Sequence, residues 1–112
     1  MDTIKTEAIK VRIGLFNDHT HHYKTREVTG AIIPRREGLA VTRWKRQWNI
    51  THLPSGRFVG WPYERKAEAV AAMAKLYALG IPWHLRRRHV VRFVEDNRTK
   101  GHRMWRVISG RD

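Results

Sequence analysis

The chain has 112 residues, which is enough for one domain, residues 1–112, and leaves no room for two sizeable hydrophobic cores. It carries 23 Lys and Arg against 10 Asp and Glu, a formal net charge of +13, and it has no cysteine, so a disulfide framework and thiolate metal sites are excluded. No apolar run is long enough to span a bilayer and the first ten residues lack the apolar region of a signal peptide, so we expect a soluble, cytoplasmic protein.

Two strands are predicted before residue 34. Residues 8–16 alternate between apolar side chains on one face and Lys10 and Arg12 on the other, which is typical of a strand buried on one side. Residues 26–33 are predicted to form a second strand, and residues 35–38 a turn.

The loop between these strands is polar and rich in histidine. It contains three candidate metal ligands, His19, His21 and His22. A structural zinc site needs four ligands, and Asp18 is the only carboxylate nearby. We therefore expect a polar surface loop without a metal.

Residues 39–52 alternate again, with a turn expected near residues 45–47. The even positions carry the more apolar set Ala40, Thr42, Trp44, Trp48, Ile50 and His52. The odd positions carry Arg43, Lys45, Gln47, Asn49 and Thr51. This pattern predicts that the odd side chains share one solvent-exposed face of a sheet.

Residues 54–56, Pro-Ser-Gly, predict a tight turn, after which residues 57–61 return as a paired strand. Trp44, Trp48 and Trp61 are expected in the core beneath a helix. Phe58 is out of phase with its neighbours, which indicates a bulged turn in preference to an exposed platform for an unpaired base.

A helix is predicted over about residues 63–79 because this segment is rich in alanine, has Glu64 and Glu68 near its start, and is followed by Gly80. After it, HVVRFV and RMWRVI flank a turn-rich stretch and predict a second hairpin. The expected fold class is α+β, with an antiparallel sheet of about five or six strands and one main alanine-rich helix packed on it.

The positive charge is concentrated in two segments. The net charge is +5 over residues 31–63 and +6 over residues 84–112, against +1 for residues 1–30 and +1 for residues 64–83. Arg, Lys, Gln and Asn are the side chains that bind phosphates and base edges, although a solvated sheet face or connector also carries them. The candidate nucleic-acid-binding residues are Arg43, Lys45, Gln47, Asn49, Arg57, Arg86, Arg87, Arg88, Arg92, Arg103 and Arg106.

The stretch RWKRQWNITHLPSGRFVGWPYERKAEAVAAMAKLYALG resembles DNA-binding modules that combine a three-stranded sheet with one helix, of the AP2 type and of the arm-binding domains of phage integrases. The resemblance covers residues 39–80 and rests on Trp48, the Ser-Gly turn at 55–56 and the Glu-Ala pair that leads the alanine-rich helix. In that family the sheet face enters the major groove. The resemblance therefore implies base-reading roles for Arg43, Lys45, Gln47 and Asn49.

We expect a non-enzymatic protein without a cofactor that binds nucleic acid, DNA more than RNA. The sequence has no paired-carboxylate pattern on a rigid element, no nucleophile motif and no Gly-rich phosphate loop. One alternative is a phage or mobile-element protein that inhibits or adapts an acidic host protein complex, such as a defence system. A third is a metal-dependent nuclease built from Asp18, Glu27 and a histidine.

Overall fold

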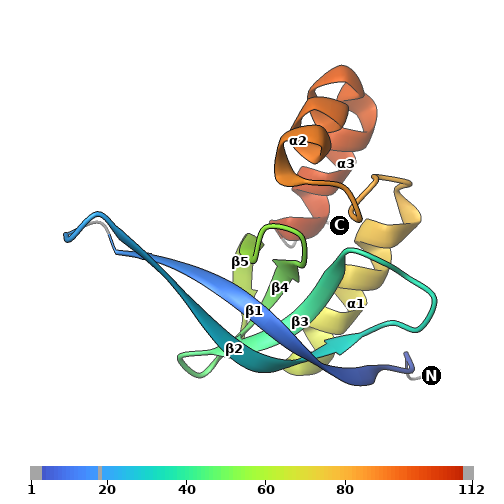
Figure 1. Ribbon diagram of the computed structural model, residues 1–112. Coiled ribbons are helices and arrows are strands. Elements are labelled where there is room, and N and C mark those ends of the chain that lie inside the picture. The colour runs from blue at the N-terminus through green and yellow to red at the C-terminus, as the bar shows by residue number, and fades with distance from the viewer. Residues whose placement is uncertain (1–3, 18, 110–112) are drawn as a thin grey trace.

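The computed structural model describes residues 4–17 and 19–109 and has an α+β fold (Figure 1). One antiparallel sheet has the order β1-β2-β3-β4-β5. Its strands are β1 (Glu7–Asn17), β2 (His22–Ile32), β3 (Leu39–Trp44), β4 (Gln47–His52) and β5 (Arg57–Tyr63). The helices are α1 (Lys66–Ala78), α2 (Arg87–Asp96) and α3 (Arg98–Ile108). The predicted antiparallel sheet and alanine-rich helix are confirmed, and two further helices are added.

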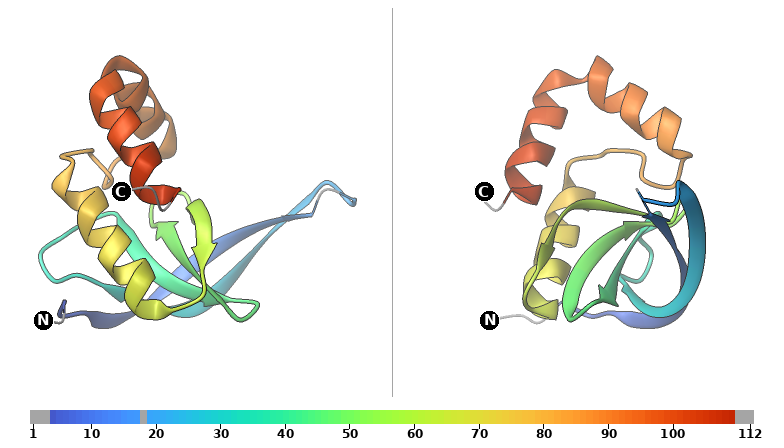
Figure 2. Two further views of the ribbon diagram at one scale, coloured as in Figure 1. Left: turned by 180° about the vertical axis from the view of Figure 1, so that it is seen from behind. Right: turned by 90° about the vertical axis from the view of Figure 1, so that its left-hand side faces the viewer.

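The β1–β2 hairpin is a long twisted ribbon. Its two strands pair continuously from Glu7 opposite Ile32 to Asn17 opposite His22, whereas β2 pairs with β3 only near Gly30. The far half of the ribbon therefore projects from the body, as Figure 1 and the left view of Figure 2 show.

The middle of β1 returns to the sheet at the β4–β5 turn. The amide of Gly14 donates a hydrogen bond to the carbonyl of Gly56 at 2.7 Å, so the sheet is strongly curved. Gly56 has a φ of +70°, which confirms the tight turn predicted over residues 54–56.

Away from the turn that joins them, strands β3 and β4 are buried on both faces. On one face, Leu39, Val41 and Ile50 pack against Met73 and Leu76 of α1. On the opposite face a second apolar cluster contains Val11, Ile13 and Ala40. The hydroxyl of Tyr77 in α1 also accepts from the Leu39 amide at 2.8 Å and donates to its carbonyl at 3.1 Å, which ties the helix to the start of β3.

The prediction of one exposed odd-numbered face is wrong. A two-residue turn, Lys45 and Arg46, joins β3 to β4, so Arg43 lies opposite Trp48. Each odd residue of β3 therefore shares its face with an even residue of β4. Asn49, expected to read base edges, is only 5% exposed, and Thr51 is fully buried.

Helix α1 begins three residues later than predicted because β5 continues through Tyr63, which pairs with Trp48. It ends as expected: Gly80 has a φ of +72° and its amide donates to the carbonyl of Tyr77 at 3.3 Å.

The predicted C-terminal hairpin is wrong, because both segments are helices. Val90, Phe93 and Val94 recur at helical spacing and pack toward the core. Met104, Val107 and Ile108 do the same in α3. Only Asn97 lies between the two helices, and its side-chain amide donates to the carbonyl of Phe93 at 2.8 Å.

His52 fixes the loop that leads from α1 to α2. Its Nε2 lies 2.9 Å from the carbonyl oxygens of both Trp83 and Leu85, so this nitrogen carries the proton and donates. Its Nδ1 then accepts from the hydroxyl of Ser55 at 2.7 Å. Burial lowers the pKa of His52, opposed by the hydrogen bonds to the two carbonyls and assisted by the charge of Arg87.

This lowered pKa predicts a loss of stability in mild acid. Below a pH of about 6.5 the unfolded chain protonates His52 while the folded chain does not, so the free energy of unfolding falls until the folded-state pKa is reached. Urea unfolding at several pH values should show this fall in the parent protein. His52→Gln should flatten it, and His22→Gln, on the exposed ribbon, should not. An unchanged slope in His52→Gln would contradict the assignment.

Candidate nucleic-acid interface

The β3–β4 turn carries a cluster of cations around two tryptophans. The guanidinium of Arg26 lies 5.2 Å from the ring centroid of Trp44, and the ammonium of Lys45 lies 5.9 Å from the same ring. On the opposite face of the hairpin, Trp48 is contacted by two cations, Arg43 at 5.4 Å and Lys66 at 5.8 Å. We call five cations the turn group: Arg26, Arg43, Lys45, Arg46 and Lys66.

The two residues of the turn itself have strained backbones. Lys45 has a φ of +50° and Arg46 a φ of +66°, a conformation that Asn-Gly or Gly-Gly adopts at lower cost. Left-handed backbone costs about 1–2 kcal/mol per non-glycine residue. Two exposed positive charges therefore lie at the tip of the hairpin on a backbone that lowers the stability of the fold. Strained backbone of this kind is typical of functional positions.

Trp61 lies on the outer strand of the sheet and is 71% exposed, so the prediction that it belongs to the core is wrong. Gly60 has a φ of +73° and the β4–β5 register shifts beside it, which takes Trp61 out of the alternation that sequence reasoning assumed. Trp48 packs beneath α1 as expected, whereas Trp44 packs on the other side of the sheet. Phe58 is half-buried in that second cluster and pairs in register with Thr51, so the bulge expected at Phe58 lies instead further along β5, beside Gly60.

A second group of cations surrounds the start of α2. We call it the helix group: Arg57, Arg86, Arg87, Arg88 and Arg92, all exposed. Arg86 is the N-cap of α2, without a side-chain cap, and the first turn contains no acidic residue. The positive end of a helix dipole is unfavourable for cations, so this arrangement lowers the stability of the helix.

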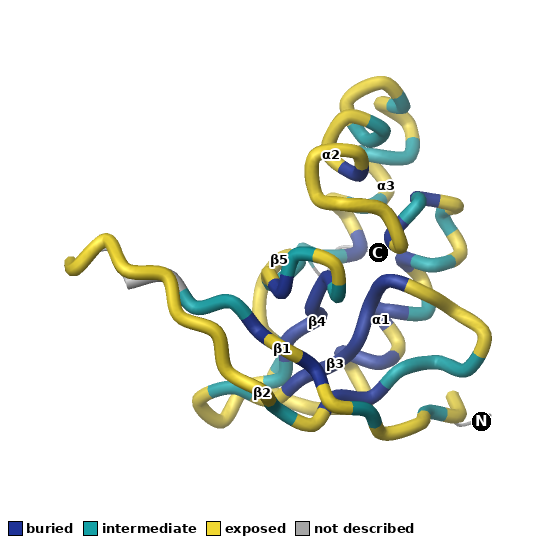
Figure 3. The backbone as a smooth tube through the Cα atoms, viewed as in Figure 1, coloured by how far each residue is buried: buried dark blue, intermediate teal, exposed yellow. Residues whose placement is uncertain are grey.

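The two groups lie at opposite ends of β4 and do not form one continuous surface. Trp48, beside the turn group, is near the start of β4, and His52, at its end, binds the carbonyl that precedes Arg86. Six residues of strand separate the ends by about 17 Å. Gln47 is exposed at the turn, and Arg103 and Arg106 are exposed on α3. Figure 3 shows that most of α2 is exposed, whereas β3 is largely buried.

Among residues 4–17 and 19–109, no three His, Cys, Asp or Glu side chains gather in a way that would hold a metal ion. His19, His21 and His22 lie in the described part of the ribbon, and Asp18 lies outside the described residues. Within the same residues, no helix has the length and apolar character needed to cross a membrane. The chain matches no protein-family model, no curated protein and no solved structure.

Proposed function

We propose that this protein binds nucleic acid along β5, with Trp61 stacking on an unpaired base and the two cation groups holding the flanking phosphates. One observation supports this most directly: β5 is an outer strand that carries an exposed tryptophan between the groups. The strand begins at Arg57, a member of the helix group, and ends at Tyr63, which lies opposite Trp48 beside the turn group. Exposed aromatic rings within a basic groove are the usual means of binding single strands.

The charge balance supports a polyanionic partner. Even if every carboxylate of the chain neutralised one cation, 13 positive charges would remain. The ion pairs Lys10–Glu27 at 3.8 Å and Arg65–Glu68 at 4.0 Å both join exposed side chains, so each contributes little.

The spacing of the two groups suits a short length of nucleic acid. Along the axis of a stacked B-DNA strand the phosphates recur about every 3.4 Å, so about 17 Å spans roughly five of them, and fewer in an extended single strand. Phosphates at the start of α2 would also offset the repulsion between the helix dipole and Arg86, Arg87 and Arg88.

This proposal differs from the binding mode that the AP2 resemblance implies. There a sheet face enters the major groove, whereas here Arg43 and Gln47 point to opposite faces and Asn49 is buried. We therefore assign recognition to the β5 edge and keep DNA as the preferred target. The protein-binding alternative predicts instead a partner that survives nuclease treatment in a pull-down.

The test measures binding to labelled 20-nucleotide single- and double-stranded DNA and RNA at two salt concentrations. Fluorescence anisotropy reports the fraction of nucleic acid bound. We expect the affinity for the single strand to fall steeply as salt rises, because phosphate contacts release condensed counterions. A salt-independent affinity, or no binding at low salt, would refute the proposal.

Trp61→Ala should weaken single-strand binding by about 5- to 150-fold, the equivalent of about 1–3 kcal/mol for one stacked base. Trp61→Phe, which keeps an aromatic face, should retain most of the affinity. Because Trp61 is exposed, both variants should unfold at nearly the parent urea concentration. Equal affinities for the alanine variant and the parent would remove Trp61 from the interface.

A further inference from the structure

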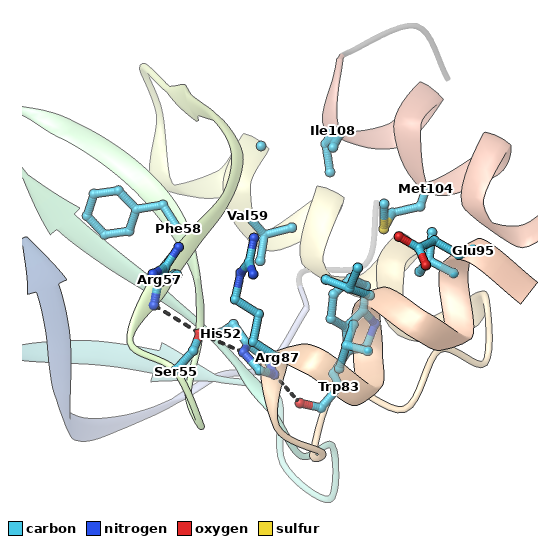
Figure 4. A pocket seen from close by; sticks show the side chains of 14 residues that line it. His52, Ser55, Arg57, Phe58, Val59, Trp83, Arg87, Glu95, Met104 and Ile108 are labelled. Carbon is cyan, nitrogen blue, oxygen red and sulfur yellow. Dashed lines mark hydrogen bonds between the residues drawn. The ribbon is translucent and has the colours of Figure 1, made fainter. Parts of the chain in front are cut away.

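A pocket with a volume of about 340 Å³ lies between β5 and the α2–α3 pair (Figure 4). Its walls are mainly apolar and include Val59 from the sheet, Val91 and Val94 from α2, and Met104 and Ile108 from α3. Val91 is 39% exposed, so the pocket opens to solvent beside it. A concave apolar site of this size is in the range that accepts small molecules.

The packing of the helices explains why the pocket is open. Helix α3 lies on β5, and a Cβ added to Gly60 would meet the Cβ of Ile108 at 2.6 Å, so the two elements are in close contact there. Helix α2 packs on α3 and, through Val90 and Phe93, toward the main core, and it has few or no backbone contacts with β5. The apolar walls between α2 and β5 consequently remain without a partner from the described chain.

The polar side chains of the pocket are unevenly placed. His52 and Ser55 are already engaged in the hydrogen bonds that fix the α1–α2 loop. In Figure 4, Arg57 and Arg87 lie on the side of His52 and Val59, and Glu95 lies on the side of Met104. Within the described residues, no hydrogen bond or ion pair engages either guanidinium.

We propose that this pocket binds a small molecule that has an apolar body and a carboxylate, with the carboxylate on Arg57 and Arg87. The apolar walls favour an aliphatic or aromatic body, because a sugar or phosphate placed there would lose its hydrogen bonds to water. Two guanidiniums at one side match a carboxylate, which accepts paired hydrogen bonds from arginine. Glu95 would disfavour a second negative charge at the opposite side.

The test uses the fatty acids butanoate to octanoate, without nucleic acid, so that its result is independent of the proposed function. Binding is followed by NMR through the methyl groups of Val59, Met104 and Ile108. We expect shifts confined to the pocket, and an affinity that rises about fourfold per methylene until the pocket is full. Shifts spread over the whole molecule, or none at millimolar octanoate, would overturn the proposal.

The role of the arginines is tested by comparing octanoate with octanol. Arg57→Gln combined with Arg87→Gln should lower the affinity for octanoate at least tenfold, because the charged hydrogen bonds are lost. The affinity for octanol should stay nearly unchanged, because the apolar walls are kept. Arg35→Gln combined with Arg36→Gln removes the same charge at the β2–β3 turn and should leave both affinities unchanged. If the two double variants lose equal affinity for octanoate, the attraction comes from the overall positive charge and not from Arg57 and Arg87. That result would contradict the proposal.

Discussion

Replacing Gly38 with alanine is expected to lower the free energy of unfolding by about 3 kcal/mol or more, because the backbone strain alone contributes about 1–3 kcal/mol. Gly38 has a φ of +110°, a region that is essentially restricted to glycine. A Cβ there would lie 2.2 Å from the carbonyl carbon of Trp83 and 2.6 Å from the amide nitrogen of His84. Both obstacles are backbone atoms, so a rotamer change cannot relieve them.

The matched control is Gly80→Ala. Gly80 also has a positive φ, +72°, but the nearest atom to an added Cβ is the ammonium nitrogen of Lys100 at 3.1 Å, which belongs to a flexible side chain. Gly80→Ala is therefore expected to lower the free energy of unfolding by about 1–2 kcal/mol, which is the strain of left-handed backbone alone. Urea unfolding followed by tryptophan fluorescence measures both. Similar losses in the two variants would show that the contact with residues 83–84 does not stabilise the fold.

The Gly38 contact also positions the candidate interface. Residues 83–84 belong to the loop that His52 holds, and this loop leads directly into Arg86 and the first turn of α2. A substitution at Gly38 should therefore displace the helix group as well as destabilise the core.

The elements with a clear period were predictable. Alternation over residues 8–16 and 39–52, the Pro-Ser-Gly turn and the alanine-rich segment followed by Gly80 all specify local structure, and the structure confirms these elements. The burial of each strand face was not predictable, because it depends on the number of residues in the β3–β4 turn. Lys45-Arg46 has no turn signature, and a change of one residue in the turn inverts the faces of β4.

The C-terminal error has a different cause. Val90, Val91 and Val94 favour strands by residue type, and the same positions fit a helix by spacing. Packing of Val90 and Phe93 against the main core decides in favour of the helix, and sequence alone does not specify that packing.

The candidate site was predicted in part. Exposed cations at Arg43, Lys45 and Arg86 follow from composition and position, and their exposure is observed. The prediction that Asn49 is exposed is wrong because the two-residue turn inverts the faces of β4 relative to β3. Trp61 was predicted to lie in the core. Its place between Gly60 and Pro62 was a sequence signal against this, since both neighbours weaken regular strand pairing.

Replacing Arg86, Arg87 and Arg88 together with glutamine should separate binding from stability. If each arginine contacts one phosphate of a single strand, the plot of log affinity against log salt concentration should become shallower, its negative slope decreasing in magnitude by about 2. The affinity at 0.1 M salt should fall by about 100-fold. The same variant should be more stable than the parent by about 1–2 kcal/mol, because three cations leave the positive end of the α2 dipole. A control variant with Lys5, Arg35 and Arg36 changed to glutamine loses the same charge away from α2.

These two readouts distinguish a phosphate site from a general positive charge. A binding surface at α2 predicts a large loss of affinity and a smaller salt slope in the α2 variant, and only a minor change in the control. If both variants lose affinity equally, the attraction is long-range and the helix group is not an interface. If the α2 variant is less stable than the parent, Arg86, Arg87 and Arg88 contribute structural contacts. In that case these arginines do not destabilise the start of α2, and their position there no longer supports a functional role.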